Sequence, residues 1–134
     1  MMPDDLAKGD MVELAIHSQR LELNKISYTT DFENLKPGFI AKLKVFLEKL
    51  TAFSVKPFIF GSKVTYIDIL AYEYLDQIRV LTPESFTGEV ADYLQRVADL
   101  PNIAAWLKSD ECTNKIYTVN SPAAPGWPGV PNQA

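Results

Sequence analysis

The sequence has 134 residues, 47% of them apolar, and a formal net charge of −4. This length suits one globular domain with its own core, and the apolar content excludes a disordered chain. The negative charge disfavours nucleic acids and anionic membrane surfaces as partners. Because no apolar run approaches the ~20 residues that span a bilayer and the N-terminus is acidic, a cytoplasmic protein is predicted.

Three long helices are predicted from apolar side chains that recur at intervals of three and four residues. The first, over about residues 3–26, opens with a proline and two carboxylates, which suit a helix N-terminus. The second is expected to start near Pro37 and to cover residues 37–53. The third should cover residues 66–81, where Pro83 closes it.

Two shorter helices are predicted near residues 89–99 and 102–109, with Pro101 separating them. The last fourteen residues hold four of the nine prolines, which favours an extended tail. The chain is therefore predicted to be all-α. A bundle of about five helices should occupy residues 1–112, followed by a Pro-rich extended C-terminal tail over residues 113–134.

A helix N-cap is predicted at Thr65 and Asp68, just before the third helix. Thr65 can accept a hydrogen bond from the Asp68 amide, while the Asp68 carboxylate reaches back to the Thr65 amide. Val64 and Ile69 stand at the flanking positions of a hydrophobic staple. Since no acid or base partner is evident near Asp68 in the sequence, we interpret it as a structural residue and not as a catalytic one.

No catalytic residue and no metal site are predicted. His17, the single histidine, has no other ligand type at metal-binding spacing and is expected on the surface. Cys112 stands alone as well, and the adjacent Asp110 and Glu111 disfavour a thiolate. The sequence also has no Ser-His-Asp set, phosphate-binding glycine loop or zinc spacing.

Four ordered blocks resemble the C-terminal, helical domain of the mu-class glutathione transferases. They are YTTDFENLKP at residues 28–37, FGSKVTYIDILAY at 60–72, LDQ at 75–77 and LPNIAAWLKS at 100–109. The similarity covers about residues 6–110, and several blocks in order at family spacing make it specific.

The resemblance implies separate roles for the two domains of the family. In that family a thioredoxin-like N-terminal domain holds glutathione and supplies the tyrosine hydroxyl that stabilises its thiolate, while the helical domain shapes a pocket for hydrophobic electrophiles. No part of this sequence resembles the thioredoxin-like domain, so that domain is predicted to be absent. This chain is accordingly expected to hold no cofactor, with glutathione a co-substrate only where such a domain is present, and not to be catalytically competent alone.

The resemblance also suggests three substrate-binding candidates. Tyr28 stands where the family places a tyrosine whose hydroxyl can bond the electrophile's developing charge, although it could equally cap the first helix and pack its ring. Asn24 replaces an apolar pocket residue one turn earlier, and Trp127 matches a tryptophan near the family's C-terminus. Ser18 replaces an acid that reaches toward glutathione in the partner subunit.

Two hypotheses follow. The chain is either the helical half of a mu-like transferase, forming the hydrophobic-substrate side of a conjugation site, or a free-standing non-catalytic module on the same fold. In the second case, the apolar face that packs against the thioredoxin-like domain in the family would bind a hydrophobic small molecule, a partner protein or a second copy, giving a dimer.

Overall fold

A computed structural model describes residues 3–29, 31–52, 57–79 and 81–113. All regular secondary structure within these ranges is helical, as predicted. None of their helices is long and apolar enough to cross a membrane. The predicted Pro-rich tail lies, apart from its first residue, outside the described ranges.

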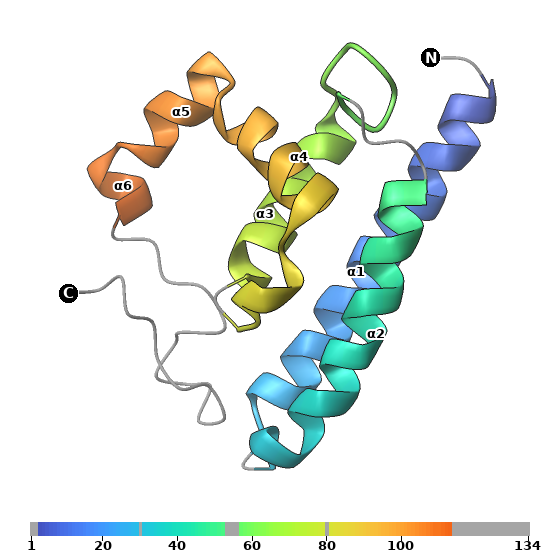
Figure 1. The fold of residues 1–134 in the computed structure, drawn as a ribbon, viewed down its shortest axis with the longest axis vertical. Coiled ribbons are helices and arrows are strands. Elements are labelled where there is room, and N and C mark those ends of the chain that lie inside the picture. The colour runs from blue at the N-terminus through green and yellow to red at the C-terminus, as the bar shows by residue number, and fades with distance from the viewer. Residues whose placement is uncertain (1–2, 30, 53–56, 80, 114–134) are drawn as a thin grey trace.

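Five main helices make up the fold. The elements are α1 (Pro3–Ser27), α2 (Phe32–Ala52), α3 (Tyr66–Ile78), the 3₁₀ turn η1 (Pro83–Ser85), α4 (Gly88–Ala98), α5 (Pro101–Leu107) and the single-turn α6 (Asp110–Thr113). Figure 1 shows α1 and α2 as a long antiparallel pair, with α3 and α4 beside it and α5 and α6 on the far side. The predicted all-α bundle is thus confirmed.

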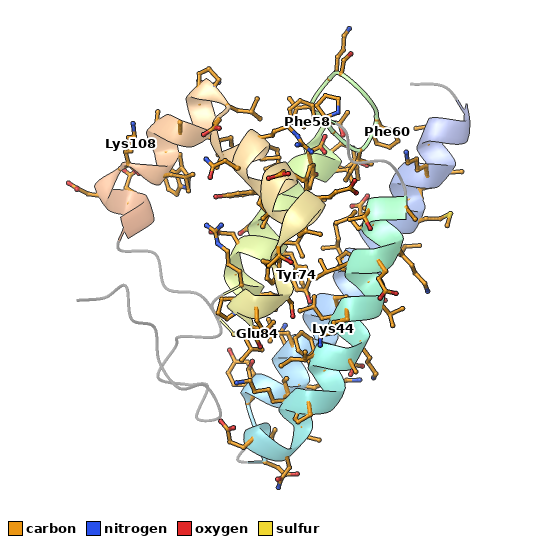
Figure 2. All side chains as sticks on the ribbon, viewed as in Figure 1. Lys44, Phe58, Phe60, Tyr74, Glu84 and Lys108 are labelled. Carbon is orange, nitrogen blue, oxygen red and sulfur yellow. The ribbon has the colours of Figure 1, made fainter. Side chains whose placement is uncertain are left out.

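The core forms where α1, α2, α3 and α4 meet. The buried apolar side chains of α1, spaced by three, four or seven residues, are Val12, Ile16, Leu23 and Ile26. Tyr74 of α3 lies fully buried between α3 and the α1–α2 pair (Figure 2). Its ring meets Phe46 edge-to-face with centroids 6.2 Å apart, and its hydroxyl donates to Gln19 Oε1 over 3.3 Å. The spacing of apolar residues by three and four therefore predicted correctly which side of α1 faces the core.

The start of α2 differs from the sequence prediction. The helix begins at Phe32, five residues before Pro37, which lies in its second turn. The Asp31 carbonyl accepts the amides of Asn34 and Leu35 at 3.1 and 3.2 Å, and the Asn34 side chain donates to Asp31 Oδ1 at 2.6 Å. These bonds nucleate the helix ahead of the proline. Proline is common in the first turn of a helix, which is why the start was predicted at Pro37. Here the hydrogen bonds made by Asp31 begin the helix one turn earlier.

Two other helix boundaries differ from the sequence prediction by smaller amounts. The third helix ends at Ile78, three residues earlier than predicted, because the Ile78 carbonyl accepts the amides of Leu81 and Thr82 in a tight turn. Pro101 does not separate the last two predicted helices but opens α5, where its missing N–H costs nothing.

Candidate functional site

An exposed line of large side chains runs along α1 opposite its core-facing side. Leu14, Leu21 and Tyr28 follow one another at intervals of seven residues, which is close to two helical turns. Their exposed fractions are 65%, 48% and 52%. Three large exposed side chains aligned on one side of a helix indicate a surface that a ligand or another protein domain can bind.

The C-terminal half of this line contains two of the predicted site residues. Asn24 and Tyr28 are both exposed, and they lie one turn apart on the outer side of the helix. The Tyr28 amide donates to the Asn24 carbonyl over 3.3 Å, so the backbone continues the helical pattern for one residue past Ser27. Together with Leu21 they form a small surface, hereafter the Tyr28 face.

The other predicted residues lie elsewhere. Trp127 falls outside the described residues. Ser18 lies on the side of α1 next to α2, in a hollow shared with Lys42 and Phe46, and so does not join the Tyr28 face. Leu21 was not among the sequence candidates, although its position midway between Leu14 and Tyr28 could have indicated it.

Two polar contacts also join α1 to α3 at the surface. The Tyr66 hydroxyl donates to Glu13 Oε2 over 3.2 Å, and Arg20 Nη2 lies 3.7 Å from Glu73 Oε2. Partial desolvation and the neighbouring Glu13 carboxylate raise the pKa of Tyr66, because both disfavour the phenolate. Because the inner side of α1 packs into the core, the Tyr28 face lies on the outer side of the helix.

At the start of α3 the Asp68 carboxylate accepts more hydrogen bonds than the single backbone bond expected from the sequence. Asp68 is fully buried, and its Oδ2 accepts the Thr65 amide over 2.9 Å to form a capping box. Its Oδ1 accepts two further bonds, from the Ile59 amide at 3.0 Å and from the Tyr93 hydroxyl at 2.6 Å. One carboxylate thereby joins α3, the loop before it and α4, which agrees with its interpretation as a structural residue.

The loop held by Asp68 also rests on the start of α1. Lys8 Nζ donates to the Ile59 carbonyl over 2.8 Å and lies 5.5 Å from the centre of the Phe60 ring. The neighbouring Gly9 leaves room for that ring, since a Cβ there would stand 3.3 Å from its edge. Figure 2 shows Phe60 on the side of the loop that faces α1.

The chemistry available on the Tyr28 face is limited to binding. A phenol and a carboxamide can donate hydrogen bonds to an anionic or polarised group, and Leu21 offers apolar contact. The three residues of this face include no base that could take a proton from a thiol. Among the residues that the structure describes, no group of three or more His, Cys, Asp or Glu side chains could hold a metal ion.

Comparison with known proteins identifies the protein family. A family model described as "Glutathione S-transferase, C-terminal domain" matches residues 21–110, and the all-helical architecture agrees with it. The chain belongs to the glutathione S-transferase family and represents its C-terminal domain. The resemblance that the sequence motifs indicated is thus confirmed.

The curated relatives narrow the similarity to the mu class. The chain is 35% identical over 112 residues to Glutathione S-transferase Mu 1 of Bos taurus, which covers 79% of this chain and 50% of that protein. It is 36% identical to Glutathione S-transferase Mu 1 of Mus musculus, and the match again covers 79% of this chain and 50% of that protein. It is 33% identical to Glutathione S-transferase Mu 4 of Homo sapiens, over 86% of this chain and 55% of that protein. The chain therefore spans about half the length of these relatives.

Proposed function

We propose that this domain forms the hydrophobic-substrate side of a site that conjugates glutathione to electrophiles. The exposure of Tyr28 at the end of α1 carries the proposal, because about half of this side chain's surface is open to solvent and can contact a ligand. The Leu21 side chain beside it provides apolar surface for an electrophile's hydrocarbon part. Membership of the glutathione S-transferase family supports this role.

Catalysis then requires a glutathione-binding half, on this chain or on another. The Tyr28 face has no cation for the carboxylates of glutathione and no base for its thiol. A thioredoxin-like half seated against the exposed line of α1 would supply both and would bury the apolar side chains. On this proposal residues 1–134 alone do not conjugate glutathione at a rate comparable to that of the complete enzymes.

A chimera tests the proposal directly. The thioredoxin-like half of Glutathione S-transferase Mu 1 of Bos taurus, joined to this helical domain, is expected to conjugate glutathione to a chloronitrobenzene, while the domain alone does not. In the chimera, Tyr28→Phe should lower kcat/KM about 10- to 150-fold, because a hydrogen bond to a charged group contributes about 1.5–3 kcal/mol. Spectrophotometric assay of the conjugate gives both results.

Tyr66→Phe is a suitable control. This second exposed tyrosine donates to Glu13 and lies outside the Tyr28 face, so its loss should leave kcat/KM within about twofold. Equal effects of the two substitutions would contradict the role of Tyr28. Rapid conjugation by residues 1–134 without any added half would contradict the need for a second half.

The second candidate function is a non-catalytic ligand-binding or protein-interaction module on the same fold. The exposed Asn24 favours it, since a carboxamide within an otherwise apolar wall can bind polar groups that a purely apolar pocket excludes. On this candidate an apolar fluorescent dye should bind the isolated domain, and Leu21→Glu should abolish the fluorescence change. Dye binding that is unaffected by this substitution would count against a ligand site on the Tyr28 face.

A further inference from the structure

The helix α5, on the side of the fold away from α1 and α2, has an apolar side that the described residues leave uncovered (Figure 1). None of its seven side chains is buried, although five of them are apolar. Leu107 packs against the core, whereas Ile103 is half-buried and Trp106 is 43% exposed. A tryptophan ring has a large apolar surface to bury and is enriched where proteins bind other segments. The exposed side of α5 around Ile103 and Trp106, hereafter the Trp106 face, is therefore a docking surface.

The sequence after α6 has the composition of a segment that binds aromatic surfaces. Residues 122–131 read PAAPGWPGVP, so a proline stands at every third position. Because a polyproline II helix has three residues per turn, this spacing aligns the four prolines on one edge of such a helix. Segments of this kind dock on surfaces lined by aromatic side chains, and their restricted backbone lowers the entropy cost of binding. Residues 116–134 contain no charged side chain that would have to be desolvated in such a contact.

The connection between the two parts favours contact within one chain. The helix α6 ends at Thr113, shortly after α5, and residues 114–121 then precede Pro122. Fully extended, this linker spans at most about 30 Å. The helix α5 is about 10 Å long, and two successive prolines of the row lie about 9 Å apart, so a pair of them can follow α5 over its length. A segment tethered by so short a linker has an effective concentration of about millimolar, which favours it over a free partner or a second copy.

We propose that the Pro-rich segment 122–131 docks on the Trp106 face of its own chain, with its proline edge against the Trp106 ring. The contact covers the apolar side of α5 without a second protein and ties the end of the chain to the helical domain. While it is docked, the segment is withheld from any other protein that recognises a row of prolines. This inference goes beyond the proposed function and uses no residue of the Tyr28 face.

Nuclear Overhauser measurements on residues 1–134 test the docking. Cross-peaks are expected between the indole protons of Trp106 and proline ring protons of residues 122–131, in dilute as well as concentrated samples. A mixture of chains labelled only on tryptophan with chains labelled only on proline identifies the source of the segment. Cross-peaks from Trp106 in that mixture would mean that a second copy supplies it, which would overturn docking within one chain. Absence of these cross-peaks from the uniformly labelled chain would overturn the proposal as well.

Substitutions on two edges of the segment provide a matched pair of variants. The first variant replaces the proline edge: Pro122→Ser, Pro125→Ser, Pro128→Ser and Pro131→Ser. The second replaces an edge without prolines: Ala123→Ser, Gly126→Ser and Gly129→Ser. The first should uncover Trp106, so that its indole N–H signal shifts and exchanges faster with water, while the second should leave that signal unchanged.

Circular dichroism shows whether the variants fold. Both sets of substitutions lie outside the described helices, so the helical signal should be the same in the natural chain and in both variants. An indole signal of Trp106 that does not respond to the loss of all four prolines would overturn the proposal. Equal responses to the two variants would do so too, because the proline edge would then have no special role.

Discussion

Replacing Asp68 by alanine is expected to lower the free energy of unfolding by at least about 3 kcal/mol, because three donors lose their acceptor at once. The Thr65 and Ile59 amides and the Tyr93 hydroxyl all donate to this carboxylate. Asp68 itself is fully buried, so water does not readily replace it. Each stranded donor costs about 1–3 kcal/mol. For a domain stabilised by about 5–15 kcal/mol, urea unfolding followed by circular dichroism will resolve the loss.

Two companion substitutions identify the cause of that loss. Asp68→Asn keeps one acceptor oxygen but turns an NH2 group toward one set of donors, so it should cost less than alanine and more than Tyr93→Phe. Asp92→Ala, at an exposed acid of α4, should change the unfolding free energy by no more than about 0.5 kcal/mol. If Asp68→Ala were no more harmful than Asp92→Ala, the role of Asp68 as a shared acceptor would be wrong.

Asp68 also shows what the sequence could and could not predict. Its bond to Thr65 was predictable, because a capping box joins residues three apart and has a recognisable pattern. Its bonds to Ile59 and Tyr93 span 9 and 25 residues, and only the fold brings these partners together. Local spacing therefore identified the residue as structural but understated how much of the domain depends on it.

The same distinction applies to the helices and to the candidate site. Apolar spacing predicted the cores of α1 and α3, whereas the start of α2 depended on bonds made by Asp31 and was misplaced at Pro37. Asn24 and Tyr28 were suggested by family resemblance, and their one-turn spacing made a common face predictable. The hollow that Ser18 shares with Lys42 and Phe46 was not predictable, since it joins residues of two helices whose relative position only packing determines.

Stability should fall steeply at alkaline pH because two tyrosine hydroxyls are inside the fold. Burial raises the pKa of Tyr93, and its bond to the Asp68 carboxylate raises it further, while Arg96 opposes the shift. Burial likewise raises the pKa of Tyr74, with Arg20 opposing. In the unfolded chain both ionise near their ordinary pKa of about 10. Their contribution to stability is therefore complete below about pH 10 and is lost as the pH rises above it, since only the unfolded chain then releases the protons.

Each buried tyrosine should contribute a slope of about 1.4 kcal/mol per pH unit in that range, or about 3 kcal/mol for the two together. Urea unfolding at several pH values between 9 and 11.5 measures it. Tyr93→Phe and Tyr74→Phe should each remove about half of the slope, whatever they do to stability at neutral pH. Tyr28→Phe, at an exposed tyrosine, serves as the matched control and should leave the slope unchanged. All other ionisable groups are the same in every variant, so the differences between variants isolate the tyrosines. Equal slopes in all three variants would mean that the buried phenols ionise without unfolding the domain.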